Sequence, residues 1–232
     1  MITSRQNPSI KKYLKLKQKK YRDLENQFLV YGHHLVEIAL KRGNVEQIIT
    51  SDENASGLLV SKEIMDEFSQ TETTLDILAV CNKTENIIKS DKILILDDIQ
   101  DPDNAGALIR SASAFGFRHI IFSNRSADFY NEKTIRASKG AIFDVYHERV
   151  QLPNKIKELK EEGYIIVGAS AHGDIKVETR PKKLTLVLGN EGAGISKEVT
   201  RLLDIETTIE VENVESLNVS VAGAILMYEW RK

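Results

Sequence analysis

Three short segments in the second half of the sequence carry more polar and glycine residues than a structural turn needs. The first, residues 97–110, contains Asp101-Pro102, which is typical of a turn, and Asn104, which is expected to cap a helix that begins at Ala105. Arg110 then lies about two turns into that helix, and an arginine near a helix N-terminus is suited to binding a phosphate. On this segment alone, a capped helix with a surface arginine is an equally good interpretation.

The second segment is a glycine-rich loop at residues 188–196. Its glycines stand at 189, 192 and 194, so the loop lacks the G-x-G-x-x-G spacing of dinucleotide-binding folds, and it lacks the lysine of a triphosphate-binding loop. Such glycines let the backbone come close to a ligand or to another segment. A structural turn would be the default interpretation, but Glu191 places a charged group among small residues, and Ser196 is a candidate cap for the next helix.

The third segment, residues 215–222, places Ser216, Asn218 and Ser220 before an apolar helix. A helix N-cap requires only one such side chain, and either Ser216 or Asn218 could provide it. The other hydrogen-bonding groups are then available for a ligand. Each of the three segments follows a predicted strand, which is the position where open α/β sheets bind ligands.

The elements that position these segments alternate between strands and helices, which predicts an α/β protein with a mostly parallel sheet. The apolar run at 92–96 is typical of a buried parallel strand, and the polar stretch 82–91 before it separates two parts of the chain. We therefore predict two domains, residues 1–88 and 89–232. The predicted helices are 8–22, 33–42, 61–69, 105–115 (ended by Gly116), 153–162, 196–203 and 217–230, and the predicted strands are 28–30, 45–50, 73–80, 92–96, 119–122, 164–169, 184–188 and 207–211.

The charges are distributed unevenly, although the formal net charge is only −2. Residues 1–22 contain no acidic residue, and their basic residues could form either a phosphate-contacting surface or a solvated helix. These basic residues are Arg5, Lys11, Lys12, Lys15, Lys17, Lys19, Lys20 and Arg22.

Several classes of protein are excluded by simple features of the sequence. Cys81 is the only cysteine, so an intramolecular disulfide and a cysteine-based zinc site are excluded, and the histidines lack the spacing of metal ligands. The apolar run at 219–227 is too short to span a bilayer, and the start of the chain does not resemble a signal peptide. We therefore expect a cytoplasmic protein with no membrane segment and no metal.

Taken together, the three segments resemble the motifs of the SpoU/TrmH family of ribose 2′-O-methyltransferases, part of the SPOUT superfamily. The similarity is carried, in order, by Asp101-Pro102-x-Asn104-x-Gly106-x-x-x-Arg110, Leu188-Gly189-Asn190-Glu191-Gly192-x-Gly194 and Glu215-Ser216-Leu217-Asn218-Val219-Ser220-Val221-Ala222. Residues 137–141 also look like the family, so the resemblance covers about residues 92–232 firmly. Residues 3–8 and 28–32 are similar to a small RNA-substrate-binding domain that is often fused in front.

The resemblance implies a fold and a cofactor that periodicity does not show. It implies a deep C-terminal trefoil knot that wraps S-adenosylmethionine in a bent conformation. Gly189 is expected to admit the cofactor because it lacks a side chain, and backbone groups at Ile209, Val211 and Leu217 are expected to recognise the adenine. The cofactor-binding residues implied in this way are Leu188, Gly189, Asn190, Gly192, Ile209, Val211, Ser216, Leu217 and Asn218.

One stretch departs from the family pattern. Where the family usually has Ile-Pro-Met and then a glycine, this sequence has Ile209-Glu210-Val211-Glu212-Asn213. The missing proline frees φ and restores an N–H group, while Asn213 can still adopt a left-handed conformation. We therefore expect cofactor affinity or loop rigidity to differ here.

The resemblance also implies a catalytic set and a substrate. The catalytic residues would be Asn104, Arg110, Glu191, Ser216 and Asn218. A guanidinium is a poor base, so we expect Arg110 to anchor the target phosphate and to donate to the developing alkoxide, while Asn104 and Asn218 orient Arg110 or the ribose. Because a 2′-hydroxyl distinguishes RNA from DNA, we expect an RNA substrate, with contacts at Arg5, Lys11, Lys12, Arg110 and Arg136.

Methyltransferases of this kind generally act as homodimers, so a homodimer is expected. The two-part layout favours ribosomal RNA, transfer RNA is the alternative, and either a housekeeping or an antibiotic-resistance role is compatible with the sequence. The rival hypotheses are a non-catalytic RNA-binding protein of the same fold, such as a ribosome-assembly factor, and an enzyme that uses the cleft for another nucleotide. The complete catalytic set argues against the first rival, and the basic N-terminal segment argues against the second.

Overall fold

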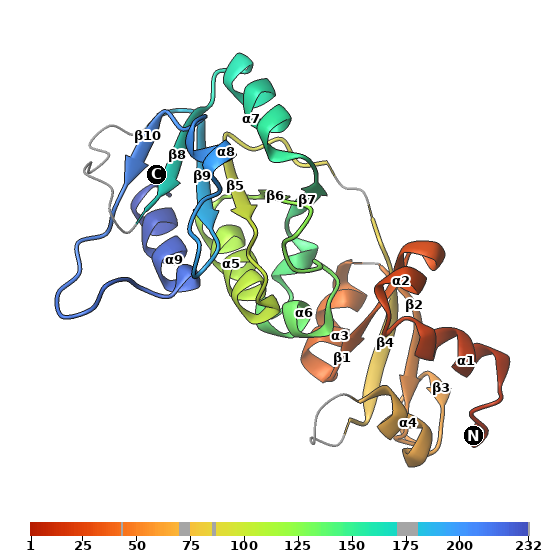
Figure 1. The fold of residues 1–232 in the computed structure, drawn as a ribbon. Helices are drawn as coiled ribbons and strands as arrows, with labels where there is room; N and C mark the ends of the chain where they lie inside the picture. Colours follow the sequence, from red (N-terminus) through yellow and green to blue (C-terminus); the bar gives the residue numbers. More distant parts are fainter. Residues whose placement is uncertain (43, 70–74, 85–86, 171–180, 232) are drawn as a thin grey trace.

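The computed structural model describes residues 1–42, 44–69, 75–84, 87–170 and 181–231, which form two α/β units built on separate sheets (Figure 1). The first sheet has the strand order β1-β4-β2-β3, in which β4 pairs antiparallel with β1 and β2, and β3 pairs parallel with β2. Its strands are β1 Gln27–Tyr31, β2 Val45–Thr50, β3 Leu58–Leu59 and β4 Ile77–Asn82, and its helices are α1 Pro8–Lys15, α2 Lys19–Glu25, α3 His33–Arg42 and α4 Lys62–Phe68.

Side chains of β1 alternate between two hydrophobic cores, as the pleat of a strand requires. Leu29 packs in the cluster that contains Ile10 of α1, whereas Phe28 and Val30 point to the opposite face and pack in the cluster that contains Val36 of α3. The strand is therefore buried on both faces, which explains its nearly continuous apolar sequence.

The basic N-terminal segment is not the single helix that the sequence predicts for residues 8–22, because α1 and α2 are separate helices. The side chain of Arg22 donates hydrogen bonds to Leu16 O and Lys17 O at the end of α1, where backbone carbonyls lack partners within the helix. Arg22 also pairs with Asp128 of the second unit and is buried. It therefore belongs to the protein interior and not to a phosphate-contacting surface.

The second sheet has the order β10-β8-β9-β5-β6-β7, and all of its pairings are parallel, which confirms the predicted α/β architecture. Leu94 and Leu96 of β5 point to the face covered by α5 and α9, and Ile93 and Ile95 point to the face covered by α7 and α8. The strands are β5 Lys92–Asp97, β6 His119–Phe122, β7 Tyr146–Arg149, β8 Ile165–Ala169, β9 Leu184–Gly189 and β10 Ile205–Thr207, and the helices are α5 Pro102–Phe115, α6 Glu132–Ser138, α7 Leu152–Glu161, α8 Lys197–Thr200 and α9 Val219–Glu229.

Some predicted elements are wrong in position or extent. The strand predicted at 207–211 is the earlier and shorter β10, and residues 208–218 form no helix or strand. The helix predicted at 196–203 is the single turn α8, and the strand predicted at 73–80 is β4, with residues 73 and 74 outside the described residues. The sequence did not predict β3, α6 or β7; β7 is a half-buried edge strand with a polar sequence.

The two units share a hydrophobic core at their interface. The ring of Phe28 in β1 lies 4.5 Å from that of Tyr130 and 6.2 Å from that of Phe143, measured between centroids. A Cβ on Gly140 would lie only 2.5 Å from Ile38 Cδ1, so a side chain of α3 packs directly on the backbone of the second unit. The sheets divide between β4 and β5, and the boundary between residues 88 and 89 remains a prediction within that interval.

Candidate active site at the carboxyl ends of β5 and β9

The three polar segments singled out in the sequence meet at one edge of the parallel sheet. β5 and β9 are neighbouring strands with Asp97 opposite Gly189, so the chain leaves both strands at the same edge. The first segment continues into α5, and the second forms the loop between β9 and α8. The third leads into α9, which packs beside α5 (Figure 1).

A chain of side-chain hydrogen bonds joins the three segments. Asn104 Nδ2 donates to Glu191 Oε1 at 2.8 Å, and Asn218 Nδ2 donates to Asn104 Oδ1 at 3.1 Å. Asn218 Oδ1 accepts from the backbone N–H of Ser220 at 2.9 Å and thereby caps α9. Because capping occupies the oxygen of Asn218, its amide nitrogen faces Asn104, and the amide nitrogen of Asn104 in turn faces Glu191.

Asn104 is not the helix cap that the sequence analysis predicts. The N-cap of α5 is Asp101, whose carboxylate accepts from the backbone N–H of Asp103 at 2.9 Å, and Pro102 occupies the first helical position. Proline is favoured there because its φ suits the helix and its missing N–H would have no partner within the helix. Asn104 therefore lies within the first turn, where its side chain is free to bridge to Glu191 and Asn218.

The glycine-rich loop is folded back on itself after β9. Asn190 Oδ1 accepts hydrogen bonds from the backbone N–H groups of Gly192 and Ala193, both at 3.0 Å. A Cβ on Gly189 would lie 2.2 Å from both Gly194 C and Ile195 N, a distance that no real side chain tolerates. Glycine is thus required at position 189 because the loop's own backbone packs against it. The sequence analysis expected a different reason, namely that the missing side chain leaves space for a cofactor.

Two anchors tie this loop to the end of β5. The carboxylate of Asp97 is buried and accepts from Ser196 N at 2.7 Å, and Asn190 Nδ2 donates to the backbone oxygen of Asp98 at 2.9 Å. The sequence analysis assigns no role to Asp97. An acidic residue at the end of an apolar strand nevertheless indicates a carboxylate with a specific hydrogen-bond partner, because burying an unpaired charge is costly. Ser196 is the N-cap residue of α8 but makes no side-chain capping hydrogen bond.

Arg110 and Ser216 lie outside the hydrogen-bonded chain. Both are exposed, and neither side chain forms a hydrogen bond or ion pair with another residue in the described part of the structure. Arg110 lies six residues after Asn104 on α5, about 9 Å along the helix axis and roughly a third of a turn around it. The structure therefore brings together three of the five predicted catalytic residues and leaves two with free side chains at the surface.

The predicted cofactor residues differ in what they present. Leu188 has a buried side chain that packs in the core, so only its backbone can contact a ligand. Ile209, Val211 and Leu217 are half-buried and belong to the irregular stretch before α9. Asn213 has φ of 63°, so it adopts the left-handed conformation that the sequence analysis considered possible.

The predicted RNA contacts are exposed cations. Arg5 pairs with Glu67 and Lys12 pairs with Glu25, but both cationic side chains keep about half or more of their surface in solvent, at 69% and 46%. Lys11 and Arg136 are exposed and have no carboxylate partner among the described residues.

Within the described ranges, no group of three or more His, Cys, Asp and Glu side chains is placed to hold a metal ion. No helix in that part of the chain is long and apolar enough to cross a membrane. The candidate site therefore offers amide, carboxylate, hydroxyl and guanidinium groups, which suit the binding of polar organic ligands and the positioning of a hydroxyl group.

Sequence comparisons divide the chain at the same place as the two sheets. The pattern of the SpoU rRNA Methylase family matches residues 91–228, and that of an MRM3-like substrate binding domain matches residues 7–79. The chain is 35% identical to the 23S rRNA (guanosine(2553)-2'-O)-methyltransferase RlmP of Bacillus subtilis, in an alignment that covers 99% of this chain and 98% of the relative.

Solved structures share the whole architecture. An AdoMet-bound rRNA methyltransferase from Sinorhizobium meliloti is similar with a TM-score of 0.86 and 25% identity, over 99% of this chain and 96% of that chain. The SpoU methyltransferase AviRb from Streptomyces viridochromogenes, in complex with AdoMet, has a TM-score of 0.84 and 24% identity over 97% of each chain, and shows the same fold.

Proposed function

The chain belongs to the SpoU rRNA methylase family of RNA methyltransferases, and from this premise we propose that it transfers a methyl group from S-adenosylmethionine to a ribose 2′-hydroxyl of ribosomal RNA. The observation that carries the proposal is the hydrogen-bonded chain of Glu191, Asn104 and Asn218, which joins three distant segments at the edge of the parallel sheet. The name of the Bacillus subtilis relative, which aligns over nearly the full chain, supports this reaction and this substrate class.

The irregular stretch between β10 and α9 suits the cofactor. Ile209, Val211 and Leu217 are half-buried, but their backbone groups form no hydrogen bond with another described residue. Their backbone groups are therefore available to a ligand, and the edge of an adenine ring offers both donors and acceptors. In this proposal these three residues hold S-adenosylmethionine together with the loop 188–192, Ser216 and Asn218.

The roles of the catalytic set follow from their chemistry. S-adenosylmethionine supplies an electrophilic methyl group when bound, so the protein must align the 2′-oxygen and ease the removal of its proton. Arg110 is a poor base but is exposed and without a partner among the described residues, so it can anchor a phosphate and donate to the developing alkoxide. Asn104 and Asn218 orient Arg110 or the ribose, Glu191 fixes the loop, and the proton leaves through the phosphate or solvent.

The RNA surface in this proposal includes Arg5, Lys11 and Lys12 of the first unit and Arg136 of the second, all exposed. Phosphate contacts by lysine and arginine provide most of the affinity of proteins for RNA without reading sequence. A ribosomal RNA substrate also implies the cytoplasm as the compartment in this proposal.

The homodimer in this proposal forms through α9. Val221, Ile225 and Tyr228 are exposed and recur at the i, i+4, i+7 spacing that places them on one helix face. The ring of Phe115 in α5 lies 5.6 Å from that of Tyr228, so the apolar face continues onto α5. Such a face beside the site supports a second copy as its partner. The hydrogen bond from Asn218 to Asn104, which holds the third segment against α5, likewise supports a C-terminal trefoil knot.

Calorimetric titration with S-adenosylmethionine tests the cofactor, and mass mapping of RNA from a strain that lacks the gene, before and after treatment with the protein, tests the reaction. We expect binding of one cofactor per chain and one new 2′-O-methyl group in ribosomal RNA. A methyl group in transfer RNA would favour the alternative substrate, and RNA binding without methylation would favour a non-catalytic factor. Absence of cofactor binding would overturn the proposal.

A further inference from the structure

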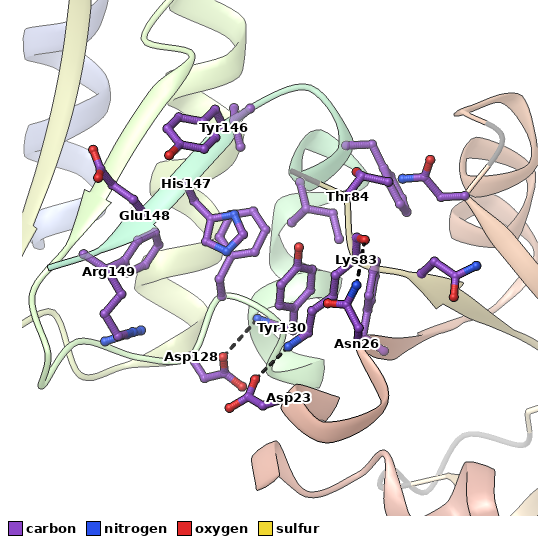
Figure 2. A pocket seen from close by; sticks show the side chains of 18 of the residues that line it. Asp23, Asn26, Lys83, Thr84, Asp128, Tyr130, Tyr146, His147, Glu148 and Arg149 are labelled. Atoms are coloured by element: carbon purple, nitrogen blue, oxygen red, sulfur yellow. Dashed lines mark hydrogen bonds and ion pairs between the residues drawn. The ribbon is translucent and has the colours of Figure 1, made fainter. Parts of the chain in front are cut away.

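A cavity lies away from the candidate active site, between the two units. It has a volume of about 310 Å³ and opens between the end of β4 on one side and β7 on the other (Figure 2). A cavity of this size falls at the lower end of the range for small-ligand sites. None of the proposed catalytic or cofactor-binding residues lines it.

One wall of the cavity is an aromatic stack. The rings of Phe129 and His147 lie parallel, 3.7 Å apart with an angle of 5° between their planes, and Tyr130 meets them edge-on. Tyr146 precedes His147 on β7 and also lines the cavity (Figure 2). Burial lowers the pKa of His147 to about 4, with a further contribution from the charge of Lys83, so the imidazole is a neutral flat ring at physiological pH.

Polar groups also line the cavity, and one of them is held in place. Lys83 pairs with Asp23 at 2.7 Å and lies 4.9 Å from the centre of the Tyr130 ring. The hydroxyl of Thr84 and the side-chain amide of Asn44 form no hydrogen bond with another described residue. A planar group placed between the walls would therefore meet an aromatic face and polar groups that have no hydrogen-bond partner among the described residues.

The charges of the cavity lining cancel, which indicates an uncharged occupant. Lys19, Lys83 and Arg149 are matched in number by Asp23, Asp128 and Glu148. Cations with no carboxylate partner among the described residues lie outside the cavity, for example the exposed Lys11 and Lys15 on α1. This arrangement suits a ligand whose neutral planar part enters the cavity while its phosphates remain outside.

We propose that this cavity takes one unpaired base of the RNA substrate, stacked against His147 and bonded at its edge by Thr84 and Asn44. The proposal rests on the RNA-directed function proposed above. Proteins read single-stranded RNA by this combination of aromatic stacking and edge hydrogen bonds, with a basic surface that follows the backbone. Because none of the proposed catalytic residues lines the cavity, the site would hold a nucleotide other than the methylated one.

The test measures methyl transfer to ribosomal RNA from the deletion strain by the full-length protein and by four variants. Thr84→Trp fills the cavity with an indole, and Thr84→Ser is its matched control. His147→Ala removes the stacking face, whereas His147→Phe keeps a flat ring. We expect Thr84→Trp and His147→Ala to raise KM for RNA about 10-fold, the size expected for the loss of one stacked base, with kcat and cofactor affinity within twofold. For Thr84→Ser and His147→Phe, KM for RNA should remain within about threefold of the value for the protein without a substitution.

Ultraviolet crosslinking of the same RNA to the unchanged protein, followed by peptide mass spectrometry, provides a readout that does not depend on activity. We expect a nucleotide adduct on Tyr146 or His147, and loss of that adduct in Thr84→Trp. Crosslinks confined to α1 and α2, or an unchanged KM in Thr84→Trp and His147→Ala, would overturn the proposal. Binding of free nucleosides at micromolar concentration without an RNA adduct would also overturn it, in favour of a small-molecule site. Failure of the proposed function is distinguishable, because the unchanged protein would then not methylate RNA.

Discussion

The side-chain amide of Asn104 donates a hydrogen bond to Glu191 across 2.8 Å, although the two residues stand 87 positions apart in the chain. The bond connects the first turn of α5 to the glycine-rich loop after β9. Since the same asparagine accepts from Asn218, its orientation is set from both ends. Any change in its donor or acceptor pattern therefore acts on two other segments of the candidate site.

Asn104→Asp should lower kcat/KM for methyl transfer by about 10- to 100-fold. A carboxylate at this position can still accept from Asn218, but it cannot donate to Glu191, and two carboxylates then face each other. Asn154→Asp is the matched control, because Asn154 also occupies the third position of a helix and is exposed on α7. Steady-state kinetics with both variants checks the prediction, and equal activities would contradict it.

Arg110→Lys should slow single-turnover methyl transfer by about 100-fold while cofactor affinity stays within twofold. Lysine keeps the charge but not the planar fork that can bind a phosphate and a second oxygen together. Arg118→Lys changes another exposed arginine beyond the end of α5 and serves as the control. Rapid-quench assays measure the single-turnover rate, and calorimetry measures the affinity for the cofactor. A near-normal rate for Arg110→Lys would exclude a role for its guanidinium in the reaction.

Gly189→Ala should abolish measurable binding of S-adenosylmethionine and destabilise the fold by several kcal/mol. The added Cβ would lie 2.2 Å from backbone atoms of the loop, so the loop could not close. Gly192→Ala is the matched control for stability, since its Cβ would approach nothing closer than Asn190 Oδ1 at 3.7 Å. Urea denaturation of the two variants and calorimetry on Gly189→Ala check the prediction, which fails if the two variants are equally stable or if Gly189→Ala still binds the cofactor.

In the proposed homodimer, Ile225→Asp should separate the two copies, so that light scattering coupled to size-exclusion chromatography gives the mass of a single chain. The side chain is 39% exposed on the apolar face of α9, so a carboxylate there is tolerated in one chain but not in an apolar interface. Leu40→Asp introduces the same charge at an exposed leucine of α3 and should leave the mass unchanged. If the protein without a substitution has the mass of a single chain, the proposed homodimer is wrong.

As the pH decreases from 6.5 to 4, the free energy of unfolding should fall more for the protein than for the His147→Phe variant. We expect the two decreases to differ by up to about 3 kcal/mol. In the folded protein, burial holds the pKa of His147 at about 4, below its ordinary value of 6.5, so the unfolded chain takes up a proton in this window while the folded protein does not. Proton uptake by the unfolded state favours unfolding as pH falls. Urea denaturation at several pH values measures the difference. Parallel curves for the protein and His147→Phe would contradict the prediction.

The parts of the fold that follow from local patterns could be predicted from the sequence. The apolar runs at 92–96 and 184–188 identify the two central strands of the parallel sheet, because such strands are buried on both faces. The three polar segments that follow predicted strands identify the end of the sheet at which the candidate active site lies. The sequence also contains the information that Asp101, and not Asn104, caps the helix. Proline favours the first helical position, so Pro102 places the cap one residue earlier, at Asp101.

Other features depend on partners that are distant in the chain. Arg22 looks like one more cation in a basic run, and only its pairing with Asp128, 106 positions away, removes it from the surface. β7 has a polar sequence because it is an edge strand at the unit interface, so no apolar pattern marks it. The cavity between the units is lined by residues from Lys19 to Arg149, and no local pattern joins them.

The packing of Phe28 against Tyr130 and Phe143 has a consequence for recognition of a large substrate. Domains joined only by a linker lose orientational freedom when one ligand contacts both, and this loss weakens binding. Here the shared core has already fixed the orientation during folding. An RNA that contacts the basic helices of the first unit and the proposed active site of the second therefore meets a preorganised surface. The protein then selects RNAs whose shape matches the fixed distance between these two regions.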